Sequence, residues 1–153
     1  MAPLTGPRPR RRYRSARGAE LVELALALPF LLLVLAGIVD VGFLFKDYQV
    51  LTNAAREGAR VAALPGWVEA DVVARVNTYL TAGGFQGAAT TTVSPVTLVT
   101  TPGRTIDAVQ VSVASPHTYF ILGPFVRFVQ GTDLGDTTLR AVATMRVEMA
   151  AGL

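Results

Sequence analysis

Apolar side chains run almost without interruption through one segment near the start of the chain. Residues 24–39 include no charged side chain, and residues 41–45 extend the run past a single carboxylate, Asp40. As an α-helix, residues 24–45 would measure about 33 Å, which is enough to cross the hydrocarbon core of a bilayer. The pattern therefore predicts a membrane-spanning helix. Pro29 lies inside this helix and has no backbone donor, so we expect a kink or a local loosening at that turn.

Helical periodicity continues beyond the apolar run, where the predicted helix becomes amphipathic. Its apolar and small positions are Val50, Leu51, Ala54, Gly58, Val61 and Ala62. They include one row of small residues spaced four apart, Ala54, Gly58 and Ala62, and a second row follows at Ala55, Ala59 and Ala63. Rows without bulk allow another element to approach closely. The element that packs against these rows could belong to the chain's own head or to a neighbouring subunit. Pro65-Gly66 ends the helix.

The rest of the chain predicts a short helix followed by a small sheet. Residues 68–80 carry an apolar stripe at helical spacing, and Gly83-Gly84 ends this second helix. The period then changes to two in residues 90–101, 108–113 and 138–149, which predicts strands. Pro95 marks the first of these as an edge strand. The expected fold is α+β: a long N-terminal transmembrane helix that continues as a stalk, a short amphipathic helix, and an antiparallel sheet of three or four strands.

An aromatic segment, residues 119–129, lies between two of the predicted strands. It is about half as long as a membrane span requires. We expect it to cover the sheet and fill the core. The alternative is a surface patch that meets the membrane or a partner subunit.

Charge is distributed unevenly along the chain. The net charge is +3, but six of the fourteen basic residues precede Ala19, and all eleven acidic residues follow it. The basic residues before Ala19 are Arg8, Arg10, Arg11, Arg12, Arg14 and Arg17. Arginines beside an apolar helix act as a cytoplasmic anchor under the positive-inside rule, which accounts for them better than nucleic-acid binding does. Pro3, Pro7 and Pro9 predict that this leader is disordered.

This distribution gives a topology and a domain organisation. We expect a basic cytoplasmic leader at residues 1–18, a transmembrane and stalk helix at residues 19–64, and an extracytoplasmic α+β head at residues 67–153. A cleaved secretory signal fits poorly, because the apolar stretch is too long and no small-x-small site follows it. Arg11-Arg12 invites a twin-arginine interpretation, but Tyr13, Arg14 and Ser15 fit that signal poorly.

One carboxylate, Glu23, lies at the start of the apolar run, five residues after Gly18. A carboxylate within a spanning helix costs free energy, which suggests that it has a function. A glycine, four residues and a glutamate before a hydrophobic helix resemble the processing site of type IV prepilins. The block from residue 19 to residue 63 also closely resembles the TadE-like family, minor pseudopilins of the tight-adherence (Tad, or Flp) pilus machinery. The matching pieces are Arg17-Gly18, Val22-Glu23, Leu28-Pro29, residues 37–40 and residues 51–60.

The resemblance implies how the chain is processed and used. A prepilin peptidase would cut after Gly18, and the mature chain would begin at Ala19 with Glu23 as its fifth residue. The Glu23 carboxylate would then meet the α-amine of an adjoining subunit, and pairing would offset much of the desolvation cost of both charges. Leu24 departs from the family, in which an aromatic residue often follows the glutamate. Other implied partners are pilins or pseudopilins, an inner-membrane assembly platform and membrane lipid, in the bacterial inner membrane.

Groups for catalysis and metal binding are few. The chain has no cysteine and a single histidine, His117, which we expect at the surface or in a turn. Asp133 and Asp136 flank glycines in a loop that offers too few oxygen ligands for calcium. No glycine-rich phosphate motif is present. We therefore expect no enzyme activity and no cofactor.

The sequence is compatible with two functions. The first is a structural subunit of a Tad/Flp-type pilus or a related secretion apparatus, with Glu23, Ala54, Gly58 and Ala62 in subunit or helix packing. The second is a membrane-anchored binding or adhesion domain whose helix only tethers it. Neighbouring genes for a pilus ATPase, a platform protein and a prepilin peptidase would favour the first.

Overall fold

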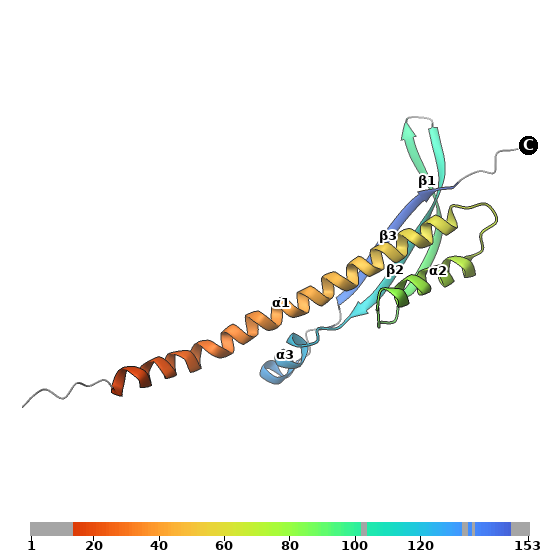
Figure 1. The fold of residues 1–153 in the computed structure, drawn as a ribbon. Coiled ribbons are helices and arrows are strands. Elements are labelled where there is room, and N and C mark those ends of the chain that lie inside the picture. Colours follow the sequence, from red (N-terminus) through yellow and green to blue (C-terminus); the bar gives the residue numbers. More distant parts are fainter. Residues whose placement is uncertain (1–13, 102–103, 133–134, 136, 148–153) are drawn as a thin grey trace, which may run out of the picture.

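A computed structural model describes residues 14–101, 104–132, 135 and 137–147 of the chain. The elements follow the order α1 (Arg14–Ala62), α2 (Glu69–Ala82), β1 (Thr90–Thr101), β2 (Arg104–His117), α3 (Leu122–Gln130) and β3 (Thr137–Arg146). Figure 1 shows a head in which α2 and the C-terminal half of α1 cover one face of a sheet. The N-terminal half of α1 extends away from this head. The fold is α+β with a long N-terminal helix like a transmembrane helix, as the sequence predicted.

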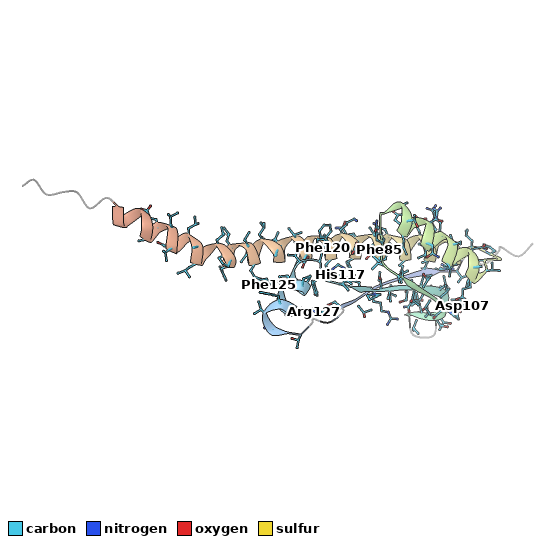
Figure 2. The ribbon with its side chains drawn as sticks, turned by 90° about the horizontal axis from the view of Figure 1, so that it is seen from below. Phe85, Asp107, His117, Phe120, Phe125 and Arg127 are labelled. Atoms are coloured by element: carbon cyan, nitrogen blue, oxygen red, sulfur yellow. The ribbon has the colours of Figure 1, made fainter. Side chains whose placement is uncertain are left out.

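The helix α1 is continuous over 49 residues. It begins at Arg14, so residues 14–18, which the sequence analysis assigned to a disordered leader, are helical here. Pro29 lies inside it, and Figure 2 shows a bend in the N-terminal part that contains this residue. The helix ends just before Pro65, and Gly66 takes a positive φ of 77°, a backbone conformation that glycine adopts without a steric penalty.

The C-terminal half of α1 packs into the head through mostly small buried side chains. Leu51, Ala54, Ala55, Ala59 and Ala62 are at most 1% exposed and belong to the core cluster of the head. Gly58 lies against α2 and β2, where a methyl group placed on it would come within 2.6 Å of Val76 Cγ2 and 3.2 Å of Val111 Cγ1. The row of small residues therefore brings α1 close to the chain's own head, the first of the two partners considered above.

The helix α2 packs by the stripe that its sequence predicted. Val72, Val76 and Leu80 are buried, whereas Val68 is the exposed N-cap residue and Val73 is half-buried. Gly83 and Gly84 end the helix, and their amides donate to carbonyls of its last turns. The stripe is thus narrower than predicted, because its first residue lies outside the helix.

The sheet is antiparallel, in the order β1-β2-β3. Its core face is built on β2, where Val109, Val111 and Val113 are buried against α1 and α2. The strand β1 has the predicted bounds and lies at an edge, with Pro95 opposite Val109. The strand β2 is longer than predicted, because pairing with β1 extends it back to Arg104 and pairing with β3 extends it on to His117. The third strand was predicted at 138–149 and is observed at Thr137–Arg146, while residues 148 and 149 lie outside the described part.

Residues 119–129 were expected to cover the sheet and fill the core, and this expectation is wrong. The segment forms α3, in which no residue is buried. It lies beside the middle of α1, beyond the end of the sheet (Figure 1). The physical reason is that α1 and α2 already cover the core face of the sheet with their own buried stripes, so no apolar face there is left for α3.

The close packing at Gly58 generates the first prediction. Gly58→Ala should lower the free energy of unfolding by up to about 2 kcal/mol, since overpacking costs about 1–3 kcal/mol and the gain in helix propensity returns about 1 kcal/mol. Thermal unfolding of the full chain in detergent, followed by circular dichroism, measures the change.

Gly42→Ala is the matched control, because no atom lies within 4 Å of a methyl group at that position of the same helix. It should leave the stability unchanged or slightly raised. In a Val76→Ala background Gly58→Ala should cost less, since the clashing methyl group is gone. Equal effects of Gly58→Ala in both backgrounds would contradict this account of the contact.

Candidate functional site

The N-terminal half of α1 exposes an extended apolar surface. No residue from 18 to 39 is buried, and large side chains such as Leu26 and Phe30 are more than 70% exposed. Leaving one such side chain in water forgoes about 1.5–3 kcal/mol relative to burying it. In the described part of the chain, Gly18–Ala62 is the one helix long and apolar enough to cross a membrane. A surface of this kind suits lipid or the helices of other subunits, and it suggests membrane anchoring.

The predicted processing residues lie at the start of this surface. Gly18 is in helical conformation, and no atom lies within 4 Å of a methyl group placed on it. Glu23 lies one helical turn beyond Ala19, so the two residues share a face of the helix. Glu20 and Glu23 are both exposed, and no described residue forms a hydrogen bond or an ion pair with Glu23. Its carboxylate is therefore available to a group outside the chain.

Asp40, the other carboxylate of the apolar segment, is only 1% exposed. Its oxygens accept hydrogen bonds from the Ile121 amide, at 3.0 and 3.1 Å, and from the Leu122 amide, at 2.6 Å. These amides are among the first donors of α3, which have no partner within their own helix. The N-cap residue, Ile121, has no side chain able to cap. Asp40 thus caps α3 from a different helix.

The sequence analysis counted Asp40 as an interruption of the apolar run and gave it no function. Two signals pointed to one. A carboxylate inside an apolar helix needs donors, and the helix that starts at Leu122 has no Ser, Thr, Asp or Asn at its N-cap to supply acceptors. Neither signal identifies the other across 81 residues of sequence, so the pairing required the structure.

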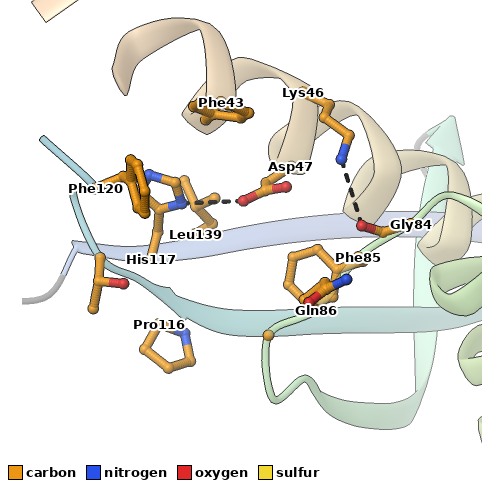
Figure 3. Close-up of a pocket in the computed structure, with 12 residues that line it drawn as sticks. Phe43, Lys46, Asp47, Gly84, Phe85, Gln86, Pro116, His117, Phe120 and Leu139 are labelled. Carbon is orange, nitrogen blue, oxygen red and sulfur yellow. Dashed lines mark hydrogen bonds and ion pairs between the residues drawn. The ribbon is translucent and has the colours of Figure 1, made fainter. Parts of the chain in front are cut away.

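A cleft of about 550 Å³ lies where α1 meets the end of β2 (Figure 3). Its lining residues are Phe43, Lys46, Asp47, Gly84, Phe85, Gln86, Gly87, Pro116, His117, Thr118, Phe120 and Leu139. Within it, His117 Nδ1 lies 3.2 Å from Asp47 Oδ2, and Lys46 Nζ donates to the Gly84 carbonyl at 3.4 Å. Both contacts connect α1 to other parts of the head, so they fix the helix rather than leave groups free for chemistry.

The expected surface position of His117 is wrong. The residue is 8% exposed in the last position of β2, and its ring meets that of Tyr119 edge to face at a centroid distance of 5.7 Å. The His117 ring can be buried because its Nδ1 atom has a partner below the surface, the Asp47 carboxylate. In the described residues no group of three histidine, cysteine or carboxylate side chains could hold a metal ion. Asp133 and Asp136 lie outside those residues.

The small residues assigned to subunit or helix packing lie inside the fold. Ala54 and Ala62 are fully buried, and Gly58 contacts α2 and β2. They are therefore closed to a neighbouring subunit as long as the head keeps this packing. Of the residues assigned to packing, Glu23 is the one that is exposed, near the start of the exposed half of α1.

Comparison with known families assigns this part of the chain. A family model described as TadE-like protein matches residues 18–60. Residues 18–60 are a TadE-like segment. It begins at the predicted processing glycine and ends two residues before the end of α1, so it covers the exposed half of the helix as well as the stalk.

The match confirms the resemblance stated from the sequence, which is to a family associated with the Tad pilus. This family is structural and pilus-associated rather than known for enzyme activity. Searches of curated proteins and of solved structures found no match to the chain. Residues 61–153, which include most of the head, lie outside the matched segment.

The cap on α3 generates the second prediction. Asp40→Ala should leave the amides of Ile121 and Leu122 without their acceptor, at a cost of about 1 kcal/mol for the lost cap. Amide hydrogen exchange in α3 should therefore accelerate in the full chain, measured by mass spectrometry in detergent. Asp40→Asn should have a smaller effect, since its side-chain oxygen can still accept.

Asp71→Ala is the control for removing a carboxylate elsewhere. Asp71 is exposed in the first turn of α2 and should change exchange only there. Wild-type exchange rates throughout α3 in Asp40→Ala would rule out the cap as the interaction that holds this helix.

Proposed function

We propose that the protein is a minor pseudopilin-like structural subunit of a Tad/Flp-type pilus or a related secretion apparatus. The observation that carries the proposal is the coincidence of the TadE-like segment with an apolar helix that is exposed outside the head and rigidly joined to it. The helix anchors the chain in the bacterial inner membrane, with its N-terminus in the cytoplasm and its head outside. Its partners are other pilins or pseudopilins, a prepilin peptidase and the inner-membrane assembly platform.

The continuous helix suits such a subunit for a physical reason. The buried half of α1 is held by the core of the head, so the exposed half projects from it in a defined direction. Exposed apolar side chains can then exchange lipid for the helices of neighbouring subunits at little cost, because both surroundings are apolar. Assembly into a fibre would rest on this exchange and on a few polar contacts that set the register.

Glu23 is the candidate for such a polar contact. Processing after Gly18 would leave a cationic α-amine on Ala19, and Glu23 would lie one turn from this new N-terminus, near the end of the helix dipole that favours a carboxylate. An amine from an adjoining subunit would supply the partner that Glu23 lacks among the described residues. Pairing offsets the desolvation that each charge suffers in an apolar surrounding.

The third prediction tests this pairing. Glu23→Gln should leave membrane insertion intact and lower the recovery of the protein with partner pilins by about tenfold, the factor that corresponds to about 1.4 kcal/mol. Co-purification from crosslinked cells, compared with the membrane fraction of the same cells, measures it. Glu20→Gln is the matched control and should change recovery little, since Glu20 lies farther from the apolar run.

Recovery of Glu23→Gln at the wild-type level would exclude the pairing mechanism. If wild-type protein is also recovered without pilin partners from cells that build the apparatus, the subunit proposal itself fails. The chain would then be better described as a membrane-anchored binding or adhesion domain.

The fourth prediction concerns processing. In cells with an active prepilin peptidase, intact-mass analysis should find a chain that begins at Ala19, and Gly18→Glu should abolish that species. The peptide bond to be cut follows Gly18, the fifth residue of α1. The first turn of this helix must therefore open before an enzyme can reach the bond. Glycine lowers the cost of opening, because it is about 1 kcal/mol poorer than alanine as a helix former.

Leu24→Phe restores the aromatic residue that often follows the glutamate in the family, and it should raise the processed fraction if the wild type is cut incompletely. Detection of the full-length chain alone, in the presence of a peptidase that processes another pilin, would exclude Gly18 as a processing site.

A further inference from the structure

The helix α3 and Phe120, which lies two residues before it, expose a set of large apolar side chains just outside the head. Phe120 is 77% exposed, Phe128 is 89% exposed, and Phe125 and Val129 are exposed as well. At 100° per residue, Leu122, Phe125, Phe128 and Val129 fall on one side of the helix, and Arg127 and Gln130 fall on the other. A short helix with one strongly apolar side and one polar side is typical of elements that lie in a membrane interface.

The attachment of α3 fixes its level along α1. Asp40 binds the first amides of α3, and Leu122 Cδ1 lies 4.0 Å from a methyl group placed on Gly37. Figure 1 shows α3 beside α1, on the side of the head nearest the exposed half, and Figure 2 marks it by Phe125 and Arg127. The exposed apolar side chains of α3 therefore continue the exposed apolar surface of α1.

The length of the span gives the same level independently. The span expected from the sequence covers residues 24–45, so Asp40 lies five residues, or about 7.5 Å, before its outer end at Phe45. Lys46, Asp47 and Tyr48 follow directly, so the apolar run has ended there, and tyrosine is a residue type enriched at membrane interfaces. Asp40, and with it α3, thus falls at the boundary between acyl chains and headgroups.

We propose that α3 lies in the outer interface of the same bilayer that α1 spans, with Phe120, Phe125, Phe128 and Val129 among the acyl chains. Asp40 has a defined role in this arrangement. The first amides of a helix that enters an apolar surrounding need acceptors that water cannot supply, and the Asp40 carboxyl oxygens supply them. The capped helix can then lie on the membrane without unsatisfied donors.

Lipid fits this surface better than a protein partner. Phe125, Phe128 and Val129 stand outward and do not line the cleft, which only Phe120 of this set borders, and they adjoin a helix surface that is itself suited to lipid. The two attachments, α1 through the bilayer and α3 at its surface, together hold the head in one orientation. A single spanning helix would leave the head free to turn about the helix axis.

The test uses the one tryptophan of the chain, Trp67. This residue follows the C-terminal end of α1, about 33 Å along the helix from Asp40, and packs against the core of the head. The full chain is reconstituted in phosphatidylcholine vesicles whose acyl chains carry bromine either near the headgroup or near the terminal methyl group. Bromine quenches tryptophan fluorescence on contact, so the loss of emission reports the depth of each tryptophan.

Two single-tryptophan variants in a Trp67→Phe background report on the two apolar surfaces. Phe128→Trp should lose emission mainly to bromine near the headgroup, as expected for a helix buried about 5–10 Å into the interface. Phe30→Trp should lose emission mainly to the deeper bromine, and Trp67 of the wild type to neither. Phe120→Trp is a second reporter for α3, and circular dichroism checks that each variant keeps its helix content.

The proposal rests on the membrane anchoring that the proposed function assumes, and the outcomes separate the two. Quenching at position 30 without quenching at positions 120 and 128 would overturn the placement of α3 and leave the anchor intact. A blue-shifted but unquenched tryptophan at position 128 would mean that another copy of the chain covers α3, and it overturns the proposal as well. Absence of quenching at position 30 would show that α1 does not span the bilayer and would overturn the membrane anchoring. Quenching of Trp67 would show that the whole head lies on the bilayer and would overturn the placement of α3 alone in the interface.

Discussion

The close approach of α1 to the core of the head is the constraint on which the rest of the structure depends. At Gly58 the backbone of α1 leaves no room for a methyl group beside Val76 and Val111. This contact fixes the direction of a helix whose other half has no support from the head. Because the helix is continuous, the packing at one end determines where the apolar surface, Glu23 and α3 lie at the other.

Local patterns predicted most of the elements, because each was encoded by contacts close in sequence. The two-residue period of β1 and the glycines after α2 placed those elements within a residue or two of their observed bounds. The ends of β2 and β3 were less accurate, since strand length depends on pairing with partners far along the chain. The partner of the small-residue row could not be predicted for the same reason, because small side chains permit a close approach without specifying which element approaches.

The candidate site was predictable only in part. Gly18 and Glu23 were predicted from sequence, because their spacing lies within a few residues of one helix, and their roles stay predictions. The bonds between Asp40 and α3 and between His117 and Asp47 span 81 and 70 residues, and no local signal announces them. The role of α3 was misjudged because its apolar side chains were taken to need the core. An amphipathic helix needs only an apolar neighbour, and the exposed half of α1 indicates what that neighbour is.

Two carboxylates in one apolar helix have different roles because their surroundings differ. Asp40 is buried and its oxygens already accept from two backbone amides, so a charge from another molecule would have to displace bonds that hold α3. Glu23 is exposed near the other end and has no such bonds among the described residues. An unpaired carboxylate within a membrane costs free energy, and the cost is recovered only when a partner arrives. In the proposed subunit the demand for a partner therefore rests on Glu23, which separates the polar contact proposed between molecules from the one observed within the chain.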